Sequence, residues 1–301
     1  MTAAGAAGAP ATAGAAGRLR RTLEMIRFSH SVFALPFALL ALVLAAGGWP
    51  SARVLGLVVV AMVAARSAAM AFNRIVDRDV DARNPRTANR HLVAGTLSVG
   101  YAKAFTVACL VVFVACAALL NRTALLLSPA VLAVLLGYSY LKRFSAAAHF
   151  GVGLALGLSP LGAWVAGAGG LVGDLRVPLA LGLAVLLWVA GFDVIYACQD
   201  AEVDRREGLH SIPARLGIPG ALRVALACHV VCIAAFVAVA WLAGLRWPYL
   251  AAVGVAAALL AYEHAIVSPR DLTRVNVAFF NVNGIVALLV GAAGILDVLA
   301  R

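Results

Sequence analysis

The sequence is poor in charge, because only 12% of its 301 residues are Asp, Glu, Lys or Arg, about half the share found in soluble domains. Hydrophobic residues make up 64% of the chain, and the mean hydropathy is +0.99. This composition excludes a soluble domain. It predicts an all-α integral membrane protein, since helices satisfy every backbone hydrogen bond within the bilayer.

Cysteines are few and carry no pairing pattern. All five fall within apolar stretches, where cysteine usually behaves as a small buried hydrophobe. The Cys228-His229-Cys232 group could bind a metal, but without a second cluster the sequence favours helix packing. No disulfide framework is expected.

Apolar runs long enough to cross a bilayer occur nine times. A polytopic bundle of about nine transmembrane helices is therefore predicted, at residues 31–48, 52–74, 99–120, 123–141, 147–168, 177–198, 219–243, 247–267 and 275–297. The Ala/Gly-rich residues 1–17 show no apolar periodicity and predict a disordered tail. Residues 18–301 form the expected single transmembrane domain.

Positive charge is distributed unevenly between the connecting segments. With the N-terminus placed in the cytoplasm, 18 of the 24 Lys and Arg residues lie on that side and five on the other, with Arg66 inside a helix. The positive-inside rule then predicts a multi-pass protein of the cell's inner (plasma) membrane whose N-terminus is cytoplasmic. Because topology explains the net charge of +11, a nucleic-acid partner is not expected, and no obligate protein partner is evident.

Carboxylates are scarce, yet eight of the thirteen lie in or beside two short segments, residues 73–81 and 193–207. Asp77 and Asp81 are four residues apart and share one helix face, as do Asp200 and Asp204. The two pairs are separated by the same interval, 123 residues, which suggests two pseudo-repeated halves. Two facing carboxylate pairs, with Asn73 in the first stripe, predict a Mg²⁺ site at which a diphosphate completes the metal shell.

Arginine-rich loops follow both acidic segments. Carboxylates that hold metal ions and arginines that bind the remaining phosphate oxygens are what a metal-diphosphate site requires. The candidates are Arg83, Arg86 and Arg90 after the first segment and His210 and Ser211 after the second. Arg205 and Arg215 are equally well explained as topological charges.

Asp193 lies two helical turns before Asp200, about 10 Å deeper in the membrane. One hypothesis gives it a catalytic role at the acceptor end of the cavity, with Arg27 and Arg66 as candidate partners. The alternative is a hydrogen bond to a neighbouring helix. Both interpretations remain open on the sequence.

The end of the fourth predicted span carries Tyr138, Tyr140, Lys142 and Arg143. Alone, these residues fit an aromatic belt with snorkelling cations. The run Gly151-Val-Gly153-Leu-Ala-Leu-Gly157 lies inside an apolar span, so small-residue helix packing explains it better than a dinucleotide loop.

These motifs resemble the UbiA superfamily of intramembrane prenyltransferases, over nearly everything from Arg18 onward. The family's Asn-x-x-x-Asp-x-x-x-Asp pattern falls on Asn73, Asp77 and Asp81, its second Asp-x-x-x-Asp on Asp200 and Asp204, and its Tyr-x-x-x-Lys element on Tyr138 and Lys142. The resemblance implies nine helices around a central cavity, cytosolic Mg²⁺-diphosphate sites and transfer of an isoprenoid chain. It also makes the fourth-span cluster a candidate site.

Within the superfamily, the stretches 27–36 and 193–213 look most like bacterial 4-hydroxybenzoate polyprenyltransferase-like proteins, a branch that includes prenyltransferases of the futalosine route to menaquinone. Two departures concern Arg74, where many members carry an acid, and His91, where proline is common. The predicted substrate-binding residues are Arg27, Arg66, Arg83, Arg86, Arg90, Tyr138, Lys142, Arg143, Tyr196, His210 and Ser211.

The resulting hypothesis is Mg²⁺-dependent transfer of a polyprenyl group from its diphosphate to an aromatic acceptor. The acceptor would be 4-hydroxybenzoate or a dihydroxynaphthoate-type ring in ubiquinone or menaquinone biosynthesis. Prenylation of haem, chlorophyll or a lipid glycerol is the alternative within this class. A transporter is the alternative from another class, but the acids gather at one membrane face instead of the midplane.

Overall fold

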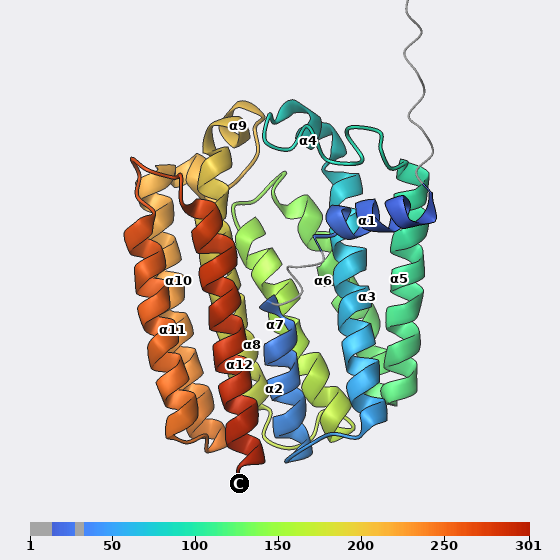
Figure 1. Ribbon diagram of the computed structural model, residues 1–301, viewed down its shortest axis with the longest axis vertical. Coiled ribbons are helices and arrows are strands. Elements are labelled where there is room, and N and C mark those ends of the chain that lie inside the picture. Colours follow the sequence, from blue (N-terminus) through green and yellow to red (C-terminus); the bar gives the residue numbers. More distant parts are fainter. Residues whose placement is uncertain (1–13, 28–32) are drawn as a thin grey trace, which may run out of the picture.

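The computed structural model describes residues 14–27 and 33–301, and within them the chain is helical with no β-strand. Twelve α-helices, a 3₁₀ turn and a π-helix follow one another, and the long helices stand side by side in one bundle (Figure 1). Their bounds are α1 Ala15–Met25, α2 Leu35–Ala46, α3 Ala52–Val76, α4 Arg78–Arg83, α5 Val99–Leu120, α6 Arg122–Leu141, α7 Ala148–Ala168, α8 Arg176–Ala197, η2 Cys198–Asp200, α9 Ala201–Arg206, α10 Ile212–Ala243, α11 Trp247–Ile266, η3 Val277–Val282 and α12 Asn283–Leu299.

Eight helical segments of the described chain are long and apolar enough to cross a membrane. The ninth expected span is shorter than predicted, because α2 has only 12 residues. Pro36 stands in its first turn, and Gly47, in the left-handed conformation, ends it. Residues 28–32, which fall partly in the predicted span, lie outside the described chain.

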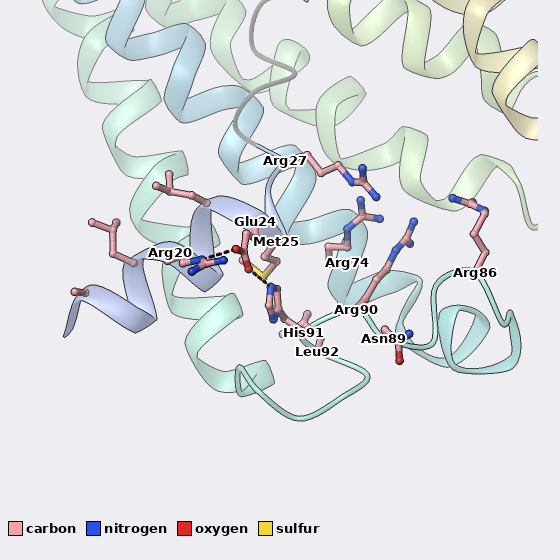
Figure 2. A pocket seen from close by; sticks show the side chains of 13 residues that line it. Arg20, Glu24, Met25, Arg27, Arg74, Arg86, Asn89, Arg90, His91 and Leu92 are labelled. Carbon is pink, nitrogen blue, oxygen red and sulfur yellow. Dashed lines mark hydrogen bonds and ion pairs between the residues drawn. The ribbon is translucent and has the colours of Figure 1, made fainter. Parts of the chain in front are cut away.

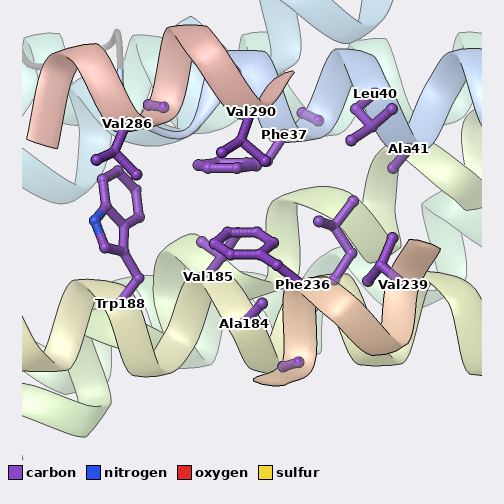
Figure 3. Packing of buried hydrophobic residues seen from close by; sticks show 14 of the residues in the cluster. Phe37, Leu40, Ala41, Ala184, Val185, Trp188, Phe236, Val239, Val286 and Val290 are labelled. Atoms are coloured by element: carbon purple, nitrogen blue, oxygen red, sulfur yellow. The ribbon is translucent and has the colours of Figure 1, made fainter. Parts of the chain in front are cut away.

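The apolar core surrounds α2. Phe37, Ala38, Leu40, Ala41 and Leu42 are fully buried, which fits a helix that is apolar on every side. The Phe37 ring stacks on Phe236 of α10 at 5.4 Å between centroids and meets Trp188 of α8 edge to face (Figure 3). Helices from both halves of the chain therefore share one core.

Glycines bring α7 and α8 into close contact. A Cβ atom on Gly153 would lie 2.4 Å from the backbone oxygen of Leu186, and one on Gly157 would lie 2.6 Å from the backbone oxygen of Gly182. No larger side chain fits at either position without moving the backbone. The glycine run in this span thus serves helix packing, as its sequence context predicted.

Both acidic segments lie at one end of the bundle, called here the motif end, where α4 and α9 connect the long helices (Figure 1). α1 also lies near this end, across the bundle instead of along it. This helix begins at Ala15, before the predicted end of the N-terminal tail at residue 17; residues 1–13 are outside the described chain. The sequence-based prediction did not include α1. A hydrogen bond between the hydroxyls of Thr22 and Tyr101, 2.9 Å apart, joins this helix to α5.

Successive long helices run in alternate directions between the two ends of the bundle, which predicts the membrane side of each connecting loop. Reporter fusions after Arg90, Arg143 and Arg215 should report the cytoplasm, and fusions after Arg122, Arg176 and Arg246 the opposite side, because positive charge is concentrated at the motif end. A cytoplasmic signal after Arg176 would overturn this arrangement.

Candidate active site

Each acidic motif lies where a long helix breaks and a short one begins. Asp77 ends α3 with φ −87° and ψ 1°, and Asp200 precedes α9 with φ −105° and ψ 3°. In the first motif the helical hydrogen-bond pattern continues through the break, since the Asp81 amide donates to the Asp77 carbonyl at 2.8 Å. The four-residue spacing therefore still acts as a helical repeat although the helix is interrupted.

The first motif contains one carboxylate with a cationic partner and one without. Asp81 is buried, and a single guanidinium nitrogen of Arg90 lies 2.6 Å from both of its carboxylate oxygens. Asp77 accepts a hydrogen bond from the Asn73 amide at 2.9 Å and forms no ion pair within the described chain. Burial raises the pKa of the Asp77 carboxyl, and the neighbouring Asp81 carboxylate adds to this shift.

The loop after the first motif folds against the second motif. Asp200 accepts a hydrogen bond from the Asn84 amide at 2.9 Å and a two-pronged contact from the Arg86 guanidinium. Arg83 forms an ion pair with Glu207 from the same side. These contacts bring together two segments that are more than 100 residues apart in the sequence.

The fourth carboxylate, Asp204, is only 1% exposed. Lys142 at the end of α6 lies 2.7 Å from one of its oxygens, and the other oxygen is buried with no hydrogen-bond partner. A buried carboxylate oxygen without a donor is costly unless a cation or water reaches it. This oxygen is therefore available as a metal ligand.

A pocket of about 780 Å³ opens at the motif end between α1 and the loop at residues 84–97. Five arginines line it, and Glu24 is the only carboxylate among the described lining residues. Glu24 is already paired with Arg20 and His91 (Figure 2). The lining arginines are Arg20, Arg27, Arg74, Arg86 and Arg90. Such a pocket suits a multiply charged anion.

Arg74, absent from the sequence-based site, is the departure from the family pattern noted above. The structure places it on the pocket lining beside Arg27 and Arg90 (Figure 2), and its guanidinium lies 3.4 Å from the Asn73 amide oxygen. An arginine in place of an acid thus adds positive charge beside the first motif.

The contacts of Asp193 require a correction. Its hydrogen-bond partner is His149 of the neighbouring helix α7, 2.7 Å away, which is the alternative left open by the sequence, and no ion pair joins it to Arg27 or Arg66 in the described chain. The Ile212 amide lies 3.4 Å from His149 Nε2, which makes Nε2 the acceptor and leaves the proton on Nδ1, facing Asp193. Arg66 instead donates to the backbone oxygen of Arg27 at 3.2 Å. A histidine 44 residues from Asp193 gave no sequence signal.

The other candidate residues take different positions. The Tyr196 hydroxyl lies 2.9 Å from the Arg86 guanidinium, which also stands over the Tyr196 ring. Arg143 donates to the Val76 carbonyl at 2.6 Å, and the His210 amide donates to the Lys142 carbonyl at 2.8 Å. Tyr138 lies beside Gly151 of α7. Ser211 is fully buried and caps α10, so its side chain serves the helix start.

The donor set of the two motifs fits Mg²⁺. Carboxylate and amide oxygens are the ligands this ion prefers, and it is commonly held by one or two carboxylates with substrate phosphates and water. The described residues contain no group of three or more His, Cys, Asp or Glu side chains placed to hold a metal. Each aspartate pair would supply two carboxylates to a Mg²⁺ ion, and substrate phosphates and water would have to complete its ligands.

The fold and this site define a polytopic membrane protein with an arginine-lined pocket and two aspartate pairs at one end of its bundle. The model of the UbiA prenyltransferase family matches residues 34–285. The chain belongs to this family and is a prenyltransferase embedded in the membrane.

Curated relatives and solved structures agree with this assignment. The chain is 32% identical over 244 residues to a 4-hydroxybenzoate octaprenyltransferase of Cupriavidus necator, a match covering 78% of this chain and 81% of the relative. The relative of the same name in Methylobacillus flagellatus is 31% identical over 262 residues, covering 85% and 84%.

Among solved structures, a UbiA homolog from Aeropyrum pernix K1 is 39% identical with a TM-score of 0.81, covering 89% of this chain and 98% of that one. A UbiA homolog from Archaeoglobus fulgidus, bound to DMAPP and Mg²⁺, has a TM-score of 0.71 at 21% identity and covers 93% and 99%. At that identity the second likeness supports the fold alone.

Proposed function

We propose that this protein transfers a polyprenyl group from an allylic diphosphate to an aromatic ring, with 4-hydroxybenzoate or a dihydroxynaphthoate-type ring as acceptor. The observation that carries the proposal is that two arginines of the pocket lining, Arg86 and Arg90, each pair with one carboxylate of an aspartate pair at the motif end. The names of the curated relatives support the same chemistry. The proposal places the pocket on the cytoplasmic face of the inner membrane, where positive charge predominates.

At the donor end, the arginines bind the diphosphate and the aspartates organise its metal. Arg27, Arg74 and Arg90 offer guanidinium donors to phosphate oxygens, and Lys142 adds a cation beside Asp204. Asp77, Asp81, Asp200 and Asp204 would hold Mg²⁺, which neutralises the charge that develops on the leaving diphosphate. Three of these four carboxylates form ion pairs in the structure, Asp200 with Arg86, Asp81 with Arg90 and Asp204 with Lys142.

The transfer itself needs a broken C–O bond, a new C–C bond and a base. The allylic C–O bond breaks with its electron pair going to the diphosphate, and the allylic cation is attacked by a ring carbon made electron-rich by the acceptor hydroxyl. The ring proton then passes to the Asp193 carboxylate, the proposed base, and aromaticity returns. Asp193, held by the Nδ1–H of His149, is the proposed group that contacts the acceptor.

An acceptor panel tests this function. The purified protein in detergent or nanodiscs would be given one polyprenyl diphosphate, Mg²⁺ and separate acceptors: 4-hydroxybenzoate, a dihydroxynaphthoate, haem and a glycerol phosphate. With 4-hydroxybenzoate or the dihydroxynaphthoate, we expect a product whose mass exceeds that of the acceptor by one prenyl group. With haem or glycerol phosphate, we expect no such product. Prenylation restricted to haem or glycerol phosphate would overturn the proposed acceptor class.

Asp193→Asn tests whether Asp193 serves the acceptor end of the cavity or the diphosphate end. We expect weaker use of the aromatic substrate, as a raised KM or a lower kcat, with unchanged affinity for the prenyl diphosphate and Mg²⁺. The matched control is Asp174→Asn, because Asp174 lies at the opposite end of the chain's bundle, before α8, and pairs with Arg176. If donor affinity collapses while acceptor affinity is unchanged, Asp193 belongs to the diphosphate site.

A further inference from the structure

Three buried polar side chains from different helices meet below the charged site. Glu263 of α11, Asn283 at the start of α12 and Trp188 of α8 are all fully buried. The Asn283 amide nitrogen lies 3.2 and 3.1 Å from the two Glu263 oxygens, and the Trp188 indole nitrogen lies 2.6 Å from the Asn283 oxygen. The diphosphate chemistry described above uses none of the three.

The orientation of Asn283 follows from its neighbours. An indole N–H can only donate, so the Asn283 oxygen must face Trp188 and its NH₂ group must face the other way. One hydrogen then points to Glu263, and the second reaches the backbone oxygen of Ala278 at 3.0 Å. Glu263 forms no ion pair in the described chain, and its role in this network is to accept.

The Ala278 carbonyl belongs to an unusual turn. Residues Val277–Val282 form a π-helix immediately before α12, and such turns are frequent at functional sites. The wider turn changes which side chains face inward compared with a continuous α-helix. Asn283 therefore fixes the turn by bonding one of its carbonyls while Glu263 and Trp188 hold the amide.

One side chain of this turn faces the candidate active site. The Phe279 ring lies 4.4 Å from that of Tyr196 and 5.2 Å from that of Phe192, measured between centroids. Tyr196 in turn lies against Arg86, which contacts Asp200. Phe279 thus extends the charged site into an aromatic wall.

We propose that the unit formed by Glu263, Asn283 and Trp188 positions Phe279, and that Phe279 with Tyr196 binds the allylic end of the prenyl donor. The inference rests on the proposed function and names the chemistry of one part of that site. The faces of aromatic rings attract cations, and a dry wall beside the diphosphate keeps water from the allylic cation. The contact between Tyr196 and Arg86 places this wall at the donor end.

The test compares substitutions in the positioning unit with substitutions in the wall. Asn283→Leu should loosen the π-turn, measured as faster hydrogen–deuterium exchange over residues 275–284, and should increase the share of prenyl alcohol formed by water capture. Phe279→Leu should shift the products in the same way without changing the exchange. We expect the ratio of alkylated acceptor to prenyl alcohol to fall about tenfold in each, as for loss of a desolvated cation–π contact.

Two further variants control the interpretation. Glu263→Gln keeps an acceptor oxygen and should form more alkylated acceptor than Glu263→Leu. If Glu263 served only in packing, the two variants would not need to differ in this way. Ile285→Ala changes a residue of α12 that is 52% exposed and lies two positions after Asn283. Its product ratio and hydrogen–deuterium exchange should match those of the wild type. A raised KM for the acceptor alone in Phe279→Leu would assign the wall to the acceptor and overturn the inference.

Wild-type activity separates this inference from the proposed function. If the wild type prenylates an acceptor and both Asn283→Leu and Phe279→Leu keep its product ratio, the positioning role is wrong. If the wild type prenylates nothing, the proposed function fails, and with it the donor-binding role of the wall. Unchanged exchange in Asn283→Leu contradicts the role of this amide in holding the turn whatever the activity.

Discussion

Asp77→Ala is expected to reduce prenyl transfer by about a hundredfold or more, the loss that follows removal of one group stabilising transition-state charge. Within the described chain Asp77 accepts a side-chain hydrogen bond only from the Asn73 amide and forms no ion pair, so a metal ion can satisfy its charge. The fold should survive, because removing a partly buried carboxylate that lacks an ion-pair partner leaves no charge unpaired.

The control for this substitution lies two residues away. Asp79 is exposed, and helical spacing puts it on the face opposite Asp77 and Asp81, so Asp79→Ala should keep wild-type turnover. Both variants would be assayed at saturating Mg²⁺ after their thermal stability is compared with that of the wild type. A well-folded Asp77→Ala protein with near-normal Mg²⁺-dependent activity would contradict the metal role of the first motif.

Arg86→Ala should weaken donor binding by about ten- to a hundredfold, because the variant loses a guanidinium from the pocket and the two-pronged contact with Asp200. Arg86→Lys should restore little of this affinity, since an ammonium cannot reproduce the planar fork that meets Asp200 and Tyr196 together. Titration of an unreactive prenyl diphosphate analogue measures the effect directly.

The matched control for Arg86 is Arg78→Ala, which removes an exposed arginine of α4 from outside the pocket lining. Its donor affinity should equal that of the wild type. If Arg86→Ala binds the donor normally and only the acceptor KM rises, Arg86 serves the acceptor and the assignment of the two ends is reversed.

Most of the bundle could be predicted because hydropathy and helix length are local properties of the sequence. The eight long spans follow from apolar runs, and the glycine run of α7 indicated helix packing, for which the structure supplies the partner α8. The length of α2 was overestimated because hydropathy does not detect its ends, although Pro36 and Gly47 mark them. α1 was missed because its alternation of arginine and leucine is too short and too polar to indicate a span.

The candidate site was predictable only in its local part. The four-residue spacing placed Asp77 with Asp81 and Asp200 with Asp204, because helical geometry relates them directly. The contacts between the motifs depend on loop conformation, as for Arg86 with Asp200, 114 residues apart. The pairing of Asp193 with His149 depends on how α7 packs against α8 and the start of α10. No periodicity encodes such contacts.

The most direct test of the central claim is the yield of prenylated 4-hydroxybenzoate or dihydroxynaphthoate and of pyrophosphate with Mg²⁺ and with EDTA. The wild-type protein should form the two products in equal amounts with Mg²⁺, and neither after chelation. Equal yields of prenylated acceptor with Mg²⁺ and with EDTA would contradict a metal-diphosphate mechanism at the aspartate pairs.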